Sequence, residues 1–329
     1  MRFIDAATVA NSLDIAELVN TLEAAFAVGQ KAPQRHHHTI PALMADKNPA
    51  TLDKAITPRD KTLLIMPAWN DDLIGTKLVS VFPDNGAKNL PAIHGLYILM
   101  DGTNGKPLAI LDASELTRWR TAAASALAGR YLAPSNPETL LMVGTGALSI
   151  PLIKAHMSQH ESLKDILVWG RSLDKAVTIV DQLNDEGVRA NVCDNLADGA
   201  QNAHIISTAT LSSEPLIKGQ WLSNNCHIDL VGAYKPTMRE SDDKAILKSQ
   251  LFVDTFEGAL SEGGDIVQPL RDGIISKADI KADLYNLCQK HHPGRTNDAD
   301  ITLFKSVGAS LEDLVAASLV MQKITANNL

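Results

Sequence analysis

The chain has 329 residues, of which 45% are hydrophobic and 21% charged; this composition is typical of a globular protein, and the length favours two domains. A net charge of −8 leaves no basic excess to neutralise phosphates, so binding to nucleic acid is not expected. No apolar run approaches the roughly 20 residues of a membrane-spanning helix, and Asp5 falls where a signal peptide needs its apolar core. Three widely spaced cysteines without a CxxC pair favour reduced thiols, so we expect a cytoplasmic protein with no membrane partner.

The N-terminal segment, residues 7–28, has apolar side chains at helical spacing and is expected to form one or two helices. Residues 32–41 are expected to be extended, because their prolines disfavour helix. This segment contains His36–His38, whose neighbours include no Cys, Asp or Glu at ligand spacing. A solvated or hydrogen-bonded tract is therefore favoured over a metal site, and its role stays open. Residues 42–60 form a polar, proline-containing excursion.

Short runs of β-type residues then follow one another, at 63–67, 74–82, 94–100 and 107–111. Residues 101–105 (Asp-Gly-Thr-Asn-Gly) lie between the last two runs and are typical of a hairpin turn. The pattern predicts a largely antiparallel sheet that is separate from any parallel, cofactor-binding sheet.

A long helix is expected from Asp112 to Leu132, with Ser114 as its N-cap. Arg118 and Arg120 lie two positions apart on it and cannot share one face, so at most one of them points inward. The small residues after Arg120 make it the better candidate for burial, although two surface arginines fit the spacing about equally well.

A glycine turn, Gly144-Thr145-Gly146, follows the apolar run that begins at Leu140. Such a turn after a strand presents backbone N–H groups at a helix N-terminus, which suits a dinucleotide pyrophosphate. The match is incomplete, since Ser149 stands where the fingerprint has Gly or Ala. Its context supports it, because strands and helices alternate from 139 to about 255. This alternation predicts an α/β fold with a doubly wound parallel sheet of Rossmann type.

The second strand of this unit ends in Trp169-Gly170-Arg171-Ser172. An NAD site places Asp or Glu here to bind the ribose 2′-hydroxyl, and none is present. Arg171 and Ser172 can instead bind a 2′-phosphate, Arg171 through a charge-assisted fork. The sequence therefore favours NADPH, while use of NADH stays open.

The order of motifs resembles the ornithine cyclodeaminase/mu-crystallin family. The matching motifs are Ile65–Pro67, Thr76–Val79, Leu90–His94, Arg120–Ala123, Val143–Ala147, Ser207–Thr210, Gly232–Glu240 and Ile301–Gly308. The resemblance implies a homodimer. It also implies that residues 1–115 with 310–329 form an α+β substrate-binding and dimerisation domain, and that 116–309 form the Rossmann domain.

The resemblance also implies roles for individual residues. Lys77 and Arg120 are expected to be catalytic. Together with Arg35 and His94 they are expected to bind a small imino or amino acid through its carboxylate and ring. For His94, a histidine packed inside the protein is an equal alternative. The residues expected at the cofactor are Gly144, Thr145, Gly146, Ala147, Leu148, Gly170, Arg171, Ser172, Thr208, Ala209, Thr210, Tyr234, Lys305 and Gly308.

One departure from the family pattern decides between its activities. The members that cyclise ornithine carry a catalytic Asp in a Gly-Gly-Asp-x-Pro segment, and Tyr234 stands at that position here. The ending Pro236–Glu240 is similar to the ketimine reductases of the family, which reduce Δ1-pyrroline-2-carboxylate or Δ1-piperideine-2-carboxylate; ring size is not determined. The alternatives are an alanine dehydrogenase, an ornithine cyclodeaminase, and a mu-crystallin-like protein that binds NADPH without turnover.

Overall fold

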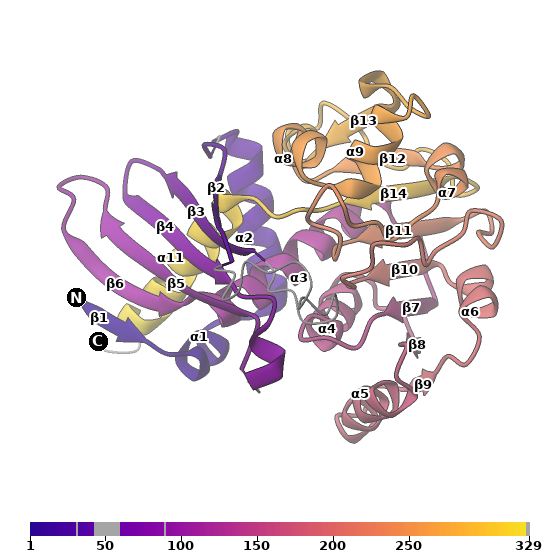
Figure 1. Cartoon of the computed structure of the whole chain (residues 1–329), viewed down its shortest axis with the longest axis horizontal. Coiled ribbons are helices and arrows are strands. Elements are labelled where there is room, and N and C mark those ends of the chain that lie inside the picture. The colour runs from indigo at the N-terminus through magenta and orange to yellow at the C-terminus, as the bar shows by residue number, and fades with distance from the viewer. Residues whose placement is uncertain (31, 43–59, 89, 327–329) are drawn as a thin grey trace, which may run out of the picture. The chain divides into compact units, whose positions relative to one another are not determined.

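The structure is a computed structural model that describes residues 1–30, 32–42, 60–88 and 90–326 (Figure 1). The excursion expected at 42–60 therefore lies, apart from its two end residues, outside the described residues. Two compact units are present, and each is considered by itself. The first consists of residues 1–13, 31–117 and 313–329, and the second of 14–30 and 118–312.

The first unit is built on a six-stranded sheet in the order β1-β6-β5-β4-β3-β2. All neighbouring strands are antiparallel except β1, which pairs parallel with β6. The strands are β1 (Arg2–Ile4), β2 (His36–Ile40), β3 (Lys61–Trp69), β4 (Leu73–Val81), β5 (Ile93–Asp101) and β6 (Pro107–Asp112). The helical segments are α1 (Ala6–Ser12), the short 3₁₀ turn η1 (Asn85–Lys88) and most of α11 (Ser310–Ala326).

The alternation of side chains in β3 and β4 shows which face of this sheet is covered. Leu64, Met66 and Ala68 are buried in β3, and every second residue from Gly75 to Val81 is buried in β4. Because the side-chain period of a strand is two, one face is covered and the other is more open. The antiparallel sheet predicted from the β-type runs is confirmed; β1 was missed because three residues carry too little periodicity.

The helix that follows β6 is α3 (Ala113–Leu132), which continues from the first unit into the second. Its N-terminal cap is Asp112, whose Oδ1 accepts a hydrogen bond of 2.7 Å from the backbone N–H of Glu115. The prediction of Ser114 as the cap was therefore wrong by two positions, because a capping side chain must precede the first helical turn.

The second unit contains an eight-stranded, wholly parallel sheet in the order β13-β12-β14-β11-β10-β7-β8-β9 (Figure 1). Its strands are β7 (Thr139–Val143), β8 (Asp165–Trp169), β9 (Ala190–Val192), β10 (Ile205–Thr208), β11 (Cys226–Leu230), β12 (Gln250–Val253), β13 (Ile280–Asp283) and β14 (Ile301–Lys305). Its helices are α2 (Ile15–Val28), the rest of α3, α4 (Ser149–Gln159), α5 (Leu173–Asp185), α6 (Leu196–Asn202), α7 (Asp243–Lys248), α8 (Phe256–Ser261), α9 (Gly264–Arg271), α10 (Leu284–Cys288) and the 3₁₀ turn η2 (Lys277–Asp279).

The predicted doubly wound sheet is confirmed, and its strand order locates the ligand crevice. From β7 the chain runs outward through β8 and β9, then returns to place β10 and β11 on the other side of β7. Ligands of such sheets bind at the carboxyl ends of the strands where the order reverses. That point lies at the ends of β7 and β10.

Several features of the second unit were not expected from the sequence, and two of them bear on the domain and strand assignments. Residues 301–305 form the buried strand β14 between β11 and β12. The helix α2 clusters with the second unit, whereas the sequence analysis assigned it to the first. No helix among the described residues is both long and apolar enough to cross a membrane.

Candidate active site

The glycine turn after β7 has the geometry of a pyrophosphate site. Gly144 has φ +125°, and a Cβ there would lie 2.7 Å from the carbonyl oxygen of Ala209, so only glycine fits. A Cβ on Gly146 would meet nothing within 4 Å, so open space borders this position. The following helix α4 has Leu148 at its N-cap and no side chain capping it. In its first turn Ser149 donates its N–H to the carbonyl oxygen of Gly146 at 3.1 Å and Pro151 has no N–H, so among the described residues the N–H of Ile150 stays available to an anion.

Ser149 explains the departure from the glycine fingerprint. Its side chain is buried, and its Oγ donates a hydrogen bond of 2.9 Å to the carbonyl oxygen of Gly144. The serine therefore closes the turn from inside, a role that the Gly or Ala of the usual fingerprint does not perform.

The end of β8 brings Gly170, Arg171 and Ser172 beside this turn. A Cβ on Gly170 would lie 2.5 Å from Cγ2 of Thr145, so glycine is what permits the approach of the two segments. Arg171 is exposed and makes no hydrogen bond or ion pair with another described residue. Its guanidinium is therefore available to a ligand. Ser172 is the N-cap of α5, and its side chain makes no capping hydrogen bond.

Lys77 lies in the first unit, buried on β4 with 2% of its side chain exposed. Its Nζ is 2.9 Å from Oδ1 and 2.8 Å from Oδ2 of Asp313 and donates to Oγ1 of Thr117 at 3.3 Å. Tyr97 stands opposite Lys77 in the β4–β5 register and is also fully buried. Burial raises the pKa of Tyr97 well above its usual value, and the charge of Asp313 raises it further.

Arg120 lies in the second unit on α3, and it is buried as the sequence analysis favoured. Its Nη1 is 2.6 Å from Oε2 of Glu312. Gly308, at φ +85°, packs against its guanidinium so closely that a Cβ would lie 2.3 Å from Nη1. The loop that contains Gly308 is anchored by Asp254, whose Oδ2 accepts from the backbone N–H of Val307 and of Gly308 at 2.6 Å each.

Each of the two predicted catalytic cations is thus paired with a buried carboxylate, and the two carboxylates, Glu312 and Asp313, are consecutive residues of α11. Neither acid was predicted from the sequence to be a site residue. Their only signal was a pair of carboxylates in the first turn of an apolar helix, a common arrangement at helix N-termini.

The other predicted substrate residues also lie in the first unit. Arg35 is half-buried and His94 is exposed on β5 opposite Ser80, so His94 is not packed in the protomer. Among the cofactor residues, Lys305 is fully buried, with Nζ 3.5 Å from Oδ2 of Asp265, and the Lys235 ammonium lies 5.6 Å from the ring centroid of Tyr234. No group of three or more His, Cys, Asp or Glu side chains in the described part of the chain could hold a metal ion.

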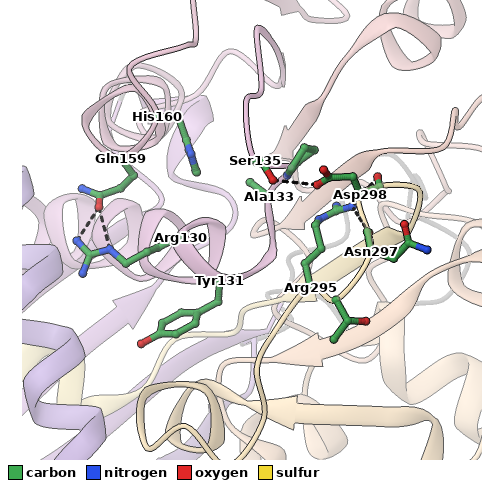
Figure 2. Close-up of a pocket in the computed structure, with 11 residues that line it drawn as sticks. Arg130, Tyr131, Ala133, Ser135, Gln159, His160, Arg295, Asn297 and Asp298 are labelled. Atoms are coloured by element: carbon green, nitrogen blue, oxygen red, sulfur yellow. Dashed lines mark hydrogen bonds between the residues drawn. The ribbon is translucent and has the colours of Figure 1, made fainter.

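A polar pocket of about 440 Å³ lies elsewhere in the second unit (Figure 2). Arg295 lines it and donates to the carbonyl oxygens of Leu132, Cys226 and Asp300 and to Oγ1 of Thr302. These partners lie at the C-terminus of α3 and at the amino ends of β11 and β14. The pocket is therefore at the edge of the sheet opposite to the glycine turn, and Arg295 acts there as a structural anchor.

Comparison with known proteins identifies the family of the chain. The family model described as "Ornithine cyclodeaminase/mu-crystallin family" matches residues 2–328. The chain belongs to this family. The family and the fold class predicted from the sequence are both confirmed.

Individual relatives are similar over nearly the whole chain. The Δ1-pyrroline-2-carboxylate reductase of Colwellia psychrerythraea is 32% identical, with 98% of this chain and 99% of that protein covered. The structure of the Thermococcus litoralis Δ1-pyrroline-2-carboxylate reductase in complex with NADH and L-proline superposes with a TM-score of 0.89 at 28% identity, covering 100% and 99% of the two chains. An archaeal alanine dehydrogenase dimer with bound NAD gives a TM-score of 0.88 at 26% identity, covering 100% and 97%. This family member is a nicotinamide-dependent oxidoreductase.

Proposed function

We propose that this protein reduces a cyclic ketimine acid with NADPH, converting Δ1-pyrroline-2-carboxylate to L-proline and, as a second substrate, Δ1-piperideine-2-carboxylate to L-pipecolate. The observation that carries the proposal is the pair of buried cations, Lys77 and Arg120, each held by its own carboxylate. The similarity to a reductase bound to NADH and L-proline supports it.

The residues after β7 and β8 fit a dinucleotide. The uncapped N-terminus of α4 and the open space at Gly146 suit a pyrophosphate. Arg171, which has no partner among the described residues, suits a 2′-phosphate. The preference for NADPH over NADH rests on Arg171 together with Ser172, since no carboxylate stands at the end of β8. Thr208–Thr210, Tyr234, Lys305 and Gly308 are proposed to complete the cofactor site.

When bound, NADPH would supply a hydride from C4 of its nicotinamide to C2 of the imine. Arg120 and Lys77 are proposed to hold the substrate carboxylate, with Arg35 and His94 as further contacts to the substrate. As C2 gains the hydride, the C=N bond becomes a single bond and the ring nitrogen carries one proton. That proton comes either from solvent, on an imine already protonated, or from the Lys77 ammonium. In both cases the protein contributes mainly orientation and charge.

Two other activities of the family are the rival outcomes. Tyr234 supplies no carboxylate to handle the δ-amino group of ornithine, which argues against cyclodeamination. An alanine dehydrogenase would instead reduce pyruvate in the presence of ammonia, and the similarity to an archaeal alanine dehydrogenase keeps this as the second candidate. That neighbour is a dimer, and we propose a homodimer here as well.

The test is the absorbance of NADPH in the presence of purified protein and one substrate at a time. We expect oxidation with pyrroline-2-carboxylate or piperideine-2-carboxylate at a kcat/KM at least about tenfold above that with pyruvate and ammonia. Binding of NADPH without oxidation by any substrate would identify a binding protein and overturn the reductase proposal. A preference for pyruvate would establish the dehydrogenase instead.

A further inference from the structure

Glu240 is a fully buried carboxylate in the second unit, the last residue of the Gly232–Glu240 motif, and it has so far been given no role of its own. Its Oε1 accepts hydrogen bonds from the backbone N–H and the Oγ1 hydroxyl of Thr210, at 2.7 and 2.8 Å. Its Oε2 accepts from the backbone N–H groups of Gly232 and Ala233, at 2.7 and 3.1 Å. One side chain thus ties the loop after β10 to the loop after β11.

The two loops approach so closely that their backbones are in contact. A Cβ on Gly232 would lie 2.0 Å from the carbonyl oxygen and 2.2 Å from the nitrogen of Thr210. Gly144, in the turn after β7, stands in the same relation to Ala209, with 2.7 Å between its Cβ position and the carbonyl oxygen. The carboxyl ends of β7, β10 and β11 therefore meet at one edge of the sheet. Glu240 holds the loops after β10 and β11 together.

Glu240 is in turn held by a second buried acid, Asp265. Oδ1 of Asp265 accepts from the backbone N–H groups of Glu240 and Ser241 at 2.9 and 2.8 Å, and from the Ser241 hydroxyl at 3.0 Å. Its Oδ2 lies 3.5 Å from the fully buried ammonium of Lys305. Burial raises the pKa of Glu240, and the charge of Lys305 counteracts that shift. Because all four groups that face the Glu240 carboxylate are donors, the site suits the ionised, acceptor-only form.

The position of these loops connects them to the cofactor, and the inference rests on the proposed function. With the pyrophosphate on the turn after β7 and the adenosine ribose at the end of β8, the nicotinamide half extends the other way, across the ends of β10 and β11. We propose that Glu240 is a positioning residue that fixes the nicotinamide subsite by holding the Thr210 loop and the Gly232–Ala233 loop in register. It acts through these loops, because both of its oxygens are already occupied by their donors.

The test compares two nucleotides that differ in the nicotinamide. Glu240→Gln keeps the shape but turns one acceptor oxygen into an amide donor that faces other donors. We expect the Kd of NADPH to rise about tenfold or more, whereas the Kd of 2′-phospho-ADP-ribose, which lacks nicotinamide, changes by less than about threefold. Both constants are measured by isothermal titration calorimetry on the full chain.

Asp229→Asn is the matched control. Asp229 is another fully buried carboxylate of the same unit, on β11, and its oxygens lie 3.0, 2.7 and 3.1 Å from Ser125 Oγ, Ser207 Oγ and His156 Nε2. Its loss is expected to lower the melting temperature while leaving the ratio of the two Kd values as in the wild type. If the effect came only from losing a buried charge, Glu240→Gln and Asp229→Asn would change the ratio of the two Kd values to the same extent.

Asp265→Asn extends the test should Glu240→Gln not fold, because it weakens the same chain of contacts one step further away. We expect it to raise the Kd of NADPH selectively but by a smaller factor. If these variants bind both nucleotides equally more weakly, or bind both as tightly as the wild type does, the inference is overturned while the proposed function stands. A wild-type protein that binds neither nucleotide overturns both.

Discussion

The carboxylate of Asp313 faces the ammonium of Lys77, with its two oxygens 2.9 and 2.8 Å from Nζ. Both side chains are almost completely buried, so neither charge can be solvated by water. Removing one partner of such a pair costs about 3–5 kcal/mol, because it leaves an unpaired charge inside the protein. We therefore predict that Asp313→Asn lowers the melting temperature and reduces kcat/KM for the imine.

Stability and activity can be separated at this pair by a double substitution. Replacing a buried ion pair by two apolar side chains is often neutral for stability. Lys77→Met combined with Asp313→Leu is therefore expected to recover most of the melting temperature lost by Asp313→Asn, while kcat/KM stays about 100-fold or more below the wild type. Recovery of activity together with stability would show that Lys77 has only a structural role.

Arg120→Lys tests the proposed contact to the substrate carboxylate. Lysine keeps the charge but loses the planar fork that binds a carboxylate through two parallel hydrogen bonds. We expect KM for the imine to rise about 10- to 100-fold. Arg130→Lys is the control on the same helix, since Arg130 also pairs with a carboxylate, that of Glu23. Its kinetic constants should stay near those of the wild type; an equal rise in KM would point to a general effect on α3.

Arg171→Ala tests the preference for NADPH. The exposed guanidinium has no partner among the described residues, so its removal should leave the fold unchanged. We expect KM for NADPH to rise about tenfold or more and KM for NADH to stay within about twofold. Arg189→Ala, which removes an arginine with 67% of its side chain exposed, controls for the change in net charge. Parallel changes for both cofactors would remove the basis for a 2′-phosphate contact.

The two glycines of the turn after β7 should respond differently to the same substitution. Gly144→Ala forces a side chain into φ +125° and against the Ala209 carbonyl oxygen, so a loss of about 1–3 kcal/mol or more is expected. Gly146→Ala places a methyl group in open space, so the free energy of unfolding should change little while dinucleotide affinity falls. Denaturant unfolding and calorimetric titration of both variants measure the contrast. Similar unfolding curves for the two variants would contradict it.

His160, which lines the pocket in Figure 2, should make the protein sensitive to acid. Burial, followed by the charges of His156 and Arg130, lowers the pKa of His160 from its usual 6.5 to about 4. Between these pH values His160 is protonated in the unfolded chain and neutral in the folded chain. The contribution of His160 to the free energy of unfolding is therefore complete above pH 6.5 and is lost as pH falls towards 4. His160→Asn is therefore expected to reduce the loss of stability over this window, by up to about 3 kcal/mol. Superimposable plots of unfolding free energy against pH for wild type and variant would contradict this.

Parts of the site could be located from the sequence because local chemistry dictates them. The glycine turn, the absence of a carboxylate after β8 and the small residues around Arg120 are each visible within a few consecutive residues. The structure confirms the burial of Arg120 and explains Ser149 by its hydrogen bond to Gly144. The roles of Lys77, Arg35 and His94 came from the resemblance alone and remain proposals.

Other parts could not be located because their partners are distant in the chain. Glu312 and Asp313 become visible as site residues only when they are placed beside Arg120 and Lys77, which precede them by 192 and 236 positions. Glu240 stands in the sequence only as the last residue of a motif, and its role becomes visible when the fold brings Thr210 and Gly232 to it. β14 was missed for the same reason, since its five residues become a central strand only through pairing with β11 and β12.

The sequence by itself determined the fold class and the nicotinamide cofactor, because strand–helix alternation and the glycine turn depend on backbone preferences that act over short distances. The family followed from the resemblance of motifs along the chain. Only the tertiary structure decided which carboxylates neutralise the buried cations and which acid joins the strand ends. A charge can be buried only where an opposite charge or a donor meets it, and the chain must fold before those groups, far apart in sequence, come within hydrogen-bonding distance.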